Sequence, residues 1–425
     1  MSAIDYAPSK SGIYQRCVLQ AESEMRYDGA LSDLRVLDFT HYIAGPYTTK
    51  LLADYGADVL KVERPEIGDG ARRMGPFPGD VPHIEKSGTF LHLNTNKRSI
   101  TLNLKSQQAQ DIIKRLVKNV DVVVESFRPG QMAAYGLDYA ALRAINPQIV
   151  VTSISNFGQT GPYRDFRSSD LMIYGMGGEM YSTGLEDREP LKLGENVVLY
   201  QAGAIAATAT MGAVFAIGSQ HVDVSLMETQ VGTIDRRMSM LLAYQYNGEI
   251  SKRSATATAG GYPNGVFICQ DGYVQIAGGR NYFDRVVAMM GAPDELLDER
   301  WYAPEAQYDP ELKDEFSAYF IPWCLERTKR EIWQAAQEAG VLSAPINAAS
   351  DLINDTGIQS RGAFAEIDHP AAGSLLYPGR PFIMQESPWS VRRPAPLLGE
   401  HTEEVLTALG YAKDDIEQLR RQGVI

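Results

Sequence analysis

Basic residues recur in the first half of the chain near the points where predicted strands end. They are Arg64, Lys97 and Arg98 just before Ile100, Lys105, Arg128 and Arg167. In open α/β sheets ligands bind outside the carboxyl ends of the strands, where Arg and Lys side chains suit phosphate groups. For any one of these residues taken alone, an ordinary surface charge is the favoured interpretation. Their recurrence at several strand ends is what predicts a phosphate-bearing ligand.

The common phosphate-binding and catalytic motifs are absent from the sequence. It contains neither a GxGxxG dinucleotide fingerprint nor a GxxxxGK[ST] phosphate loop, and no GxSxG nucleophile motif. No two of the six histidines have metal-ligand spacing, so no metal site is predicted. Asp170 and Glu179 lie beside glycine turns and are candidate catalytic carboxylates, although hydrogen-bonded structural carboxylates are commoner. The residues alone indicate an α/β enzyme that binds a phosphate-bearing cofactor.

Composition narrows the class of partner. The chain has 425 residues, with 53 acidic and 40 basic side chains and a formal net charge of −13. No long block of like charge occurs, so nucleic acid and anionic membranes are disfavoured as partners.

Cys17, Cys269 and Cys324 are far apart and odd in number, which suits a reducing cytosol rather than a disulfide framework. The N-terminus is too polar for a signal peptide, and the longest apolar run, residues 202–218, reads as a buried helix. We therefore expect a cytoplasmic protein.

Predicted strands and helices alternate over the first part of the chain. Strands are expected at 36–39, 59–63, 121–124 and 149–154, and helices at 46–55, around 112–117 and at 139–145. Short apolar runs that alternate with amphipathic helices are typical of a parallel, doubly wound sheet. Later elements are helices near 200–217 and 225–246, a hairpin at 266–276 and a helical stretch at 281–340.

The sequence predicts an α/β fold with two domains and an added arm. The arm is expected at 1–30, a large Rossmann-like domain at 31–249, a small inserted α+β domain at 250–340, and a C-terminal part at 341–425 that returns to the large domain.

Several long motifs stand in a fixed order along nearly the whole chain after residue 30. They are Val36–Thr40, Ala44–Tyr47, Leu51–Val59, Lys61–Pro65, Asn96–Ser99, Glu125–Gly130, Ser155–Pro162, His369–Pro370, Pro396–His401 and Gly423–Ile425. Together they strongly resemble the class III CoA-transferases of the formyl-CoA and carnitine type. The resemblance implies coenzyme A or an acyl-CoA as substrate, no tightly bound cofactor, and a dimer of interlocked rings.

The resemblance also implies a set of ligand contacts by motif position. The implied coenzyme A contacts are Ile43, Ala44, Arg64, Leu102, Asn103, Lys105, Ser126, Phe127, Arg128 and Arg167. This set overlaps the basic residues found near strand ends. A glycine loop at Gly260 and Gly261 matches, more loosely, a loop that covers the reacting thioester in the family.

The family mechanism needs an aspartate that attacks the acyl-CoA thioester and then carries CoA itself. That aspartate sits in a pattern like P-L-x-x-G-x-x-x-x-D-x-x-x-G, which matches residues 190–203 without a gap. The nucleophile position holds Leu199, which has no nucleophilic atom. The resemblance therefore implies that this chain has no catalytic nucleophile and does not form the covalent intermediate.

Two further departures point the same way. A basic, glycine-rich turn of the family is replaced by the uncharged segment 215–220 before His221. The related α-methylacyl-CoA racemases place a histidine at the position of Ser169 and a second base at that of Leu199. Both bases are missing here, so proton abstraction next to a thioester is disfavoured.

The leading hypothesis is a non-catalytic subunit of a hetero-oligomeric class III CoA-transferase. Its partner would be a homologous chain that carries the aspartate, as in the family's succinyl-CoA:(R)-benzylsuccinate transferase of anaerobic toluene degradation. Two alternatives stay open. One is an active homodimer that uses a displaced carboxylate, Glu195 or Asp170. The other is a CoA-binding or structural protein without transferase activity.

Overall fold

The structure, a computed structural model, describes residues 29–216, 218–232, 235–250, 253, 261–279 and 281–425. The predicted arm, apart from its last two residues, and the predicted role of Gly260 lie outside these residues. Backbone contacts divide the chain into two compact units. The first comprises the described residues of Met1–Glu179, Lys192–Glu249 and Gly362–Ile425, and the second those of Met180–Leu191 and Ile250–Arg361.

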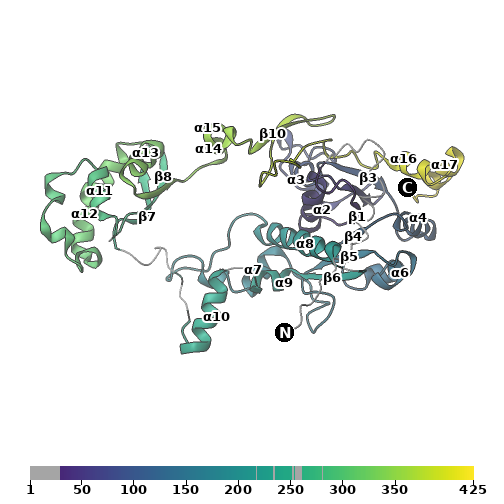
Figure 1. The fold of residues 1–425 in the computed structure, drawn as a ribbon, viewed down its shortest axis with the longest axis horizontal. Coiled ribbons are helices and arrows are strands. Elements are labelled where there is room, and N and C mark those ends of the chain that lie inside the picture. The colour runs from purple at the N-terminus through teal and green to yellow at the C-terminus, as the bar shows by residue number, and fades with distance from the viewer. Residues whose placement is uncertain (1–28, 217, 233–234, 251–252, 254–260, 280) are drawn as a thin grey trace, which may run out of the picture. The chain divides into compact units, whose positions relative to one another are not determined.

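A six-stranded parallel sheet forms the centre of the first unit (Figure 1). Its strands are β1 (Arg35–Phe39), β2 (Asp58–Glu63), β3 (Lys97–Thr101), β4 (Val122–Glu125), β5 (Val150–Ser155) and β6 (Gln220–Ser225). The strand order is β3-β2-β1-β4-β5-β6, and every neighbouring pair is parallel. The order reverses between β1 and β4, which is the topological switch point of a doubly wound sheet. The predicted Rossmann-like, doubly wound fold is confirmed.

Helices flank this sheet because the chain between strands carries apolar residues at helical spacing. They are α2 (Ala44–Asp54), α3 (Gly88–Leu93), α4 (Gln107–Val117), α5 (Gln131–Ala134), α6 (Tyr139–Ile145), α7 (Asp170–Met176), α8 (Val197–Phe215) and α9 (Leu226–Gly232). A further helix, α10 (Asp235–Asn247), follows α9 and contacts it. In α4, for example, Ile112, Ile113 and Val117 are fully buried while Asp111 is exposed. This is the one-sided pattern expected of a helix that covers a sheet.

Helix α8 packs closely against α2. A side chain at Gly203 would place its Cβ 2.5 Å from the carbonyl oxygen of Ala44, so the contact requires glycine. The Thr48 hydroxyl donates to the carbonyl of Gly203 at 3.0 Å. Among the described helices, α8 alone is long and apolar enough to cross a membrane, and one such helix is weak evidence for a span.

The C-terminal residues share the core of the sheet. The hairpin β10 (Phe364–His369) and β11 (Gly373–Pro378) is followed by α16 (Thr402–Ala408) and α17 (Lys413–Arg421). Leu406 and Leu419 belong to the same buried cluster as Leu37, Phe39 and Ile100. The C-terminal residues therefore belong to the same unit and the same core as the N-terminal strands.

The second unit combines a three-stranded antiparallel sheet with helices. Its elements are β7 (Asn264–Cys269), β8 (Gly272–Ala277), β9 (Leu342–Pro345), α11 (Phe283–Met289), α12 (Pro310–Leu325), α13 (Lys329–Ala339), α14 (Ala349–Asn354) and α15 (Thr356–Ser360). Trp301, Phe316 and Phe320 are buried in its core. Because β9 pairs with β8, residues 341–361 group with this unit, whereas the sequence analysis places them in the C-terminal part. The domain boundaries themselves remain predictions.

Candidate functional site

A pocket of about 1040 Å³ lies at the carboxyl edge of the sheet, where β2, β3 and β4 end. We call it the strand-end pocket. Of the residues predicted to contact the ligand, those that line it are Arg64, Leu102, Asn103, Lys105, Phe127 and Arg128. They come from three separate strand ends that parallel pairing brings together.

The other four predicted residues lie elsewhere. Ser126 does not line the pocket, and its hydroxyl accepts a hydrogen bond from the backbone N–H of His41 at 3.0 Å. Ile43 and Ala44 are buried at the start of α2, and Arg167 is exposed away from the pocket lining. The structure thus brings together six of the ten predicted residues around one cavity.

Three cations on the wall are available to a ligand. Arg64, Lys105 and Arg128 are exposed, and within the described part of the chain their side chains form no ion pair or hydrogen bond. A cluster of unpaired cations in one concave site raises the local positive potential, although the whole chain is acidic. The strand-end pocket therefore favours an anionic ligand such as a phosphate ester.

The turn after β4 directs Phe127 and Arg128 to the pocket. The backbone N–H of Phe127 donates to the Glu125 carboxylate at 2.8 Å, which folds the chain back over the strand end. Burial raises the pKa of Glu125 to about 7, against the opposing hydrogen bonds from Ser153 and Phe127. The carboxyl group that holds this turn is thus poised to titrate near neutrality.

The opposite wall comes from the C-terminus and was not predicted as part of the site. Its members are Leu398, Gly399, Glu400, Thr402, Glu403, Arg420, Gly423 and Ile425. The N–H of Asn103 donates to the carbonyl of Val424 at 2.8 Å, which attaches the end of the chain beside Lys105. The motifs 396–401 and 423–425 carried the family resemblance, but their type and spacing gave no sign of a binding role.

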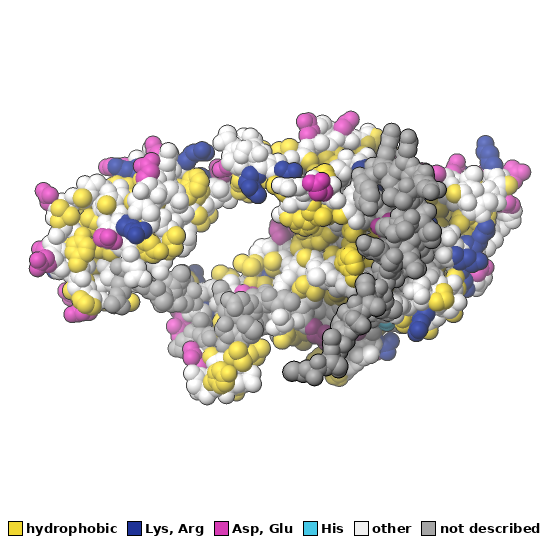
Figure 2. Space-filling model, viewed as in Figure 1, with side chains coloured by type: hydrophobic (Ala, Val, Ile, Leu, Met, Phe, Trp, Pro, Cys, Tyr) yellow, Lys and Arg dark blue, Asp and Glu magenta, His cyan; other side chains and the backbone are white. Residues whose placement is uncertain are grey.

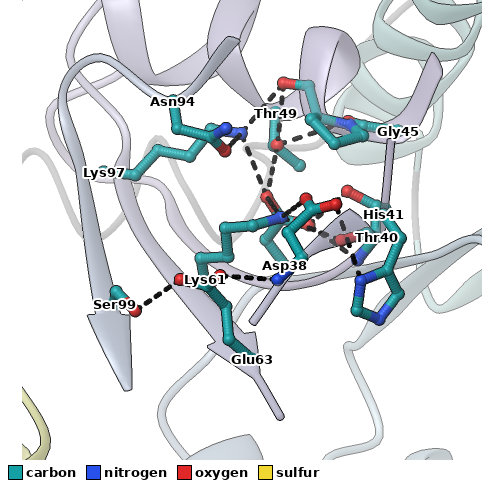
Figure 3. A network of polar contacts seen from close by, with 12 residues as sticks. Asp38, Thr40, His41, Gly45, Thr49, Lys61, Glu63, Asn94, Lys97 and Ser99 are labelled. Atoms are coloured by element: carbon teal, nitrogen blue, oxygen red, sulfur yellow. Dashed lines mark hydrogen bonds and ion pairs between the residues drawn. The ribbon is translucent and has the colours of Figure 1, made fainter. Parts of the chain in front are cut away.

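A network of buried charges fixes the strand ends behind the pocket (Figure 3). The Lys61 ammonium lies 2.9 Å from Asp69 and 3.8 Å from Asp38, and the Lys97 ammonium lies 3.1 Å from Asp38. All four side chains are fully buried. Burial alone would raise the pKa of Asp38, but the charges of Lys61 and Lys97 hold it below its ordinary value. His41, which lines the pocket, has its Nδ1 3.7 Å from Asp69.

Leu199 lies in the first turn of α8 and is half-buried. The two carboxylates predicted as alternative nucleophiles, Glu195 and Asp170, lie nearby in sequence but differ in their surroundings. Glu195 is exposed, with a backbone φ of 55°, in the loop before the helix. Asp170 is ion-paired with Lys192 at 2.8 Å, and the same ammonium donates to the carbonyl oxygens of Leu193 and Glu195.

The loosely matched glycine loop is described only at its end. Gly261 has a φ of 76°, and a Cβ there would lie 2.5 Å from the side chain of Gln307, so the position requires glycine. No group of three His, Cys, Asp or Glu side chains that could hold a metal ion occurs in the described residues.

Comparison with known proteins identifies the family. The model of CoA-transferase family III matches residues 31–402. The chain belongs to this family. A succinate–glutarate CoA-transferase of Agrobacterium fabrum is 34% identical over 391 residues, which cover 89% of this chain and 95% of that protein. A succinyl-CoA–D-citramalate CoA-transferase of Chloroflexus aurantiacus is 32% identical over 418 residues, covering 95% of this chain and 100% of that protein.

A solved structure agrees with this assignment. The crystal structure of a CaiB/BaiF family protein from Brucella suis has 30% sequence identity and a TM-score of 0.77, and the match covers 90% of this chain and 100% of that one. Class III CoA-transferases use CoA thioesters as substrates without a tightly bound cofactor. The predicted family and substrate class are therefore confirmed.

Proposed function

We propose that this chain is a non-catalytic, CoA-binding subunit of a hetero-oligomeric class III CoA-transferase. The observation that carries the proposal is Leu199, which occupies the nucleophile position of the family pattern in the first turn of α8. A leucine side chain cannot form an acyl anhydride or a thioester. The catalytic aspartate would come from a homologous partner chain in an interlocked dimer.

The strand-end pocket supports CoA binding by this chain. Coenzyme A carries several phosphate charges, and Arg64, Lys105 and Arg128 offer unpaired cations in a cavity of about 1040 Å³. A ligand that binds only the folded state stabilises it, so a subunit without chemistry can still respond to the acyl-CoA pool.

An apolar surface on α10 supports association with a partner. Leu241, Leu242, Tyr244 and Tyr246 are exposed on this helix, and Figure 2 shows hydrophobic side chains gathered there. Exposed apolar patches of this kind mark contact surfaces in soluble proteins.

For the substrates we propose succinyl-CoA as donor and a dicarboxylic acid as acceptor. The names of the two relatives given above both contain succinate or succinyl-CoA. We also propose (R)-benzylsuccinate as the specific acceptor, in the cytoplasm of a toluene-degrading anaerobe. Its only support is that residue 199 is not the aspartate of the family pattern.

The first experiment measures CoA transfer from succinyl-CoA by the chain alone and together with its co-encoded homologue. The acceptors are succinate labelled with ¹³C, glutarate and (R)-benzylsuccinate. We expect transfer by the pair and none by the lone chain. Robust transfer by the lone chain would overturn the proposal, and loss of that transfer in Asp170→Asn would assign the nucleophile to Asp170.

A second experiment tests the pocket itself by titration calorimetry of CoA into the lone chain. One charge-assisted hydrogen bond contributes about 1.5–3 kcal/mol, so Arg64→Gln and Arg128→Gln are each expected to weaken binding at least about tenfold. Arg143→Gln is the matched control, because Arg143 is also exposed in the first unit but does not line the pocket. Equal affinities for all three variants would rule out the strand-end pocket as the CoA site.

A further inference from the structure

His41 follows the end of β1 by two residues and lines the strand-end pocket. Strands β1 and β4 pair at the point where the strand order of the sheet reverses. Ligands of doubly wound sheets bind outside the strand ends at this point. Neither the sequence analysis nor the proposed function gives His41 a role, although the fold puts its imidazole at the switch point of the sheet.

Backbone contacts fix the position of His41. Its own N–H donates to the Ser126 hydroxyl beyond β4 at 3.0 Å, and the next N–H, of Tyr42, donates to Asp69 at 2.8 Å. The carbonyl that precedes His41 accepts a hydrogen bond from the buried Lys61 ammonium at 2.8 Å. The residue is thus attached to β2 and to the turn after β4, so its side chain is positioned before a ligand binds.

The two ring nitrogens of His41 have different surroundings. Nδ1 is buried and lies 3.7 Å from the Asp69 carboxylate (Figure 3). Nε2 is accessible to solvent and has no hydrogen-bond partner within the described residues. A histidine that serves only the core has both nitrogens bonded inside the protein, as His369 does. His41 therefore has one nitrogen left for a ligand in the pocket.

Asp69 determines which nitrogen of His41 carries the proton. Burial alone would raise the pKa of Asp69, but the charge of Lys61 and then the contact with His41 hold it below its ordinary value. Because this carboxylate is charged, Nδ1 of the ring is the donor and Nε2 of the neutral ring is an acceptor. An ionised phosphate oxygen offers no proton to an acceptor. Nε2 can therefore bind phosphate only after it gains a proton.

The charged groups around His41 leave the wall of the pocket positive. Those behind the pocket are paired within the protein and are Asp38, Lys61, Glu63, Asp69, Arg72 and Lys97. On the wall Arg420 pairs with Glu403 at 2.7 Å, while Glu66 and Glu400 form no ion pair within the described part of the chain. Three unpaired cations stand against these two carboxylates. This balance opposes a further positive charge on the ring until an anion is bound.

We propose that His41 is a further ligand-contact residue of the strand-end pocket, and that its Nε2 donates a hydrogen bond to a phosphate oxygen of coenzyme A. The bond requires the imidazolium, so binding takes up one proton from solvent at Nε2 and dissociation returns it. The inference rests on the proposed function, because it assumes that the pocket holds CoA. It adds a pH dependence that the Arg and Lys side chains cannot supply, since they keep their charge across the neutral range.

The test is titration calorimetry of CoA into the full chain at pH 6, 7 and 8.5, with wild type and His41→Gln. The glutamine amide has a similar reach but cannot gain a proton. An imidazole changes its charge between about pH 5 and 8, so the wild-type affinity should fall along this series. We expect His41→Gln to bind at least about tenfold more weakly than wild type at pH 6 and within about threefold of it at pH 8.5. His41→Phe, which keeps a ring without nitrogens, should behave in the same way.

The number of protons taken up is measured separately. The titration at pH 7 is repeated in buffers of different ionisation enthalpy, which gives the protons taken up for each CoA bound. Wild type should take up more than His41→Gln. The phosphate monoester of CoA, with a second pKa of about 6, and Glu125, whose pKa burial raises to about 7, also titrate in this range. Both are common to wild type and variant, so the difference isolates His41.

His83→Gln is the matched control, because His83 is exposed in the same unit and does not line the pocket. Its affinity and proton count should equal those of wild type. The inference is overturned if His41→Gln binds CoA as tightly as wild type at pH 6, or if it takes up as many protons. In either case wild-type binding, and its loss in Arg64→Gln and Arg128→Gln, still support the proposed function. A wild-type chain that binds no CoA would overturn both.

Discussion

Replacing Arg72 is the change whose effect on the free energy of unfolding can be worked out most fully from the contacts in the structure. It lies in the short 3₁₀ helix Gly70–Arg73, and its side chain is fully buried. The guanidinium pairs with both oxygens of Glu63, at 2.8 and 2.9 Å, and with Glu85 at 2.6 Å. It also donates to the carbonyl of Pro396 at 3.0 Å and lies 3.7 Å above the ring of Phe90. One side chain thus connects the end of β2 to the C-terminal segment.

Replacing Arg72 with Met keeps most of the volume but removes the charge. The Glu63 carboxylate then stays buried with only the Ser99 hydroxyl and the N–H of Asp69 as donors. Breaking a buried ion pair from one side costs about 3–5 kcal/mol because an uncompensated charge remains. We expect Arg72→Met to lower the free energy of unfolding by about this amount at pH 7.

The assay is urea denaturation followed by circular dichroism, with Glu63→Gln/Arg72→Met as the partner variant. The double variant removes the stranded charge, so it is expected to recover at least half of the loss. In the wild type Arg72 holds the pKa of Glu63 below its ordinary 4.5, so this stabilisation is present above pH 4.5 and is lost as the pH falls through the lowered pKa. The difference between wild type and Arg72→Met should therefore shrink in acid. A single variant within about 1 kcal/mol of wild type, or a double variant no more stable than the single, would refute the reasoning.

Three further predictions concern other buried groups. His92 has a pKa of about 4 in the fold against 6.5 unfolded, so stability should fall as the pH drops from 6.5 towards 4, and His92→Gln should flatten that part of a denaturation profile. Glu125 has its pKa raised from 4.5 to about 7, so its contribution is lost as the pH rises through that interval, and Glu125→Gln should remove this slope. Gly203→Ala should lower the unfolding free energy by about 1–3 kcal/mol, measured by urea denaturation, while Gly212→Ala, in open space on the same helix, should not.

The sheet, and the half of the candidate site that is formed by strand ends, can be predicted from local patterns in the sequence. Apolar runs such as 122–124 are stable only in buried strands, and the helices between them make those strands parallel. Parallel strands bring their carboxyl ends to one edge, so Arg64, Lys105 and Arg128 converge without any further information. Arg167 does not, because residues 156–166 separate it from β5 and carry no periodic pattern that would fix their path.

The C-terminal wall of the pocket could not be predicted in this way. Its contacts join residues about three hundred positions apart, such as the N–H of Ser99 with the ring of His401 at 3.2 Å and the N–H of Thr101 with the hydroxyl of Thr402 at 3.1 Å. Nothing in the local sequence around either residue predicts which residue it contacts. Only the packing of α16 and α17 into the core of the sheet determines which residues meet.

The position of Leu199 explains how binding and chemistry can separate in this fold. The strand-end pocket takes its lining from β2, β3, β4 and the C-terminus, and no residue of α8 contributes to it. A substitution at residue 199 therefore leaves the cations and the buried network of Asp38, Lys61 and Lys97 unchanged. If Leu199 stands in place of the nucleophile as we propose, the chain loses transfer activity but keeps the strand-end cations that we propose to bind CoA. A chain with Leu199 and intact strand-end cations is thus consistent with a subunit that binds the substrate for another chain, and the CoA titration and the lone-chain assay examine the two halves of that statement separately.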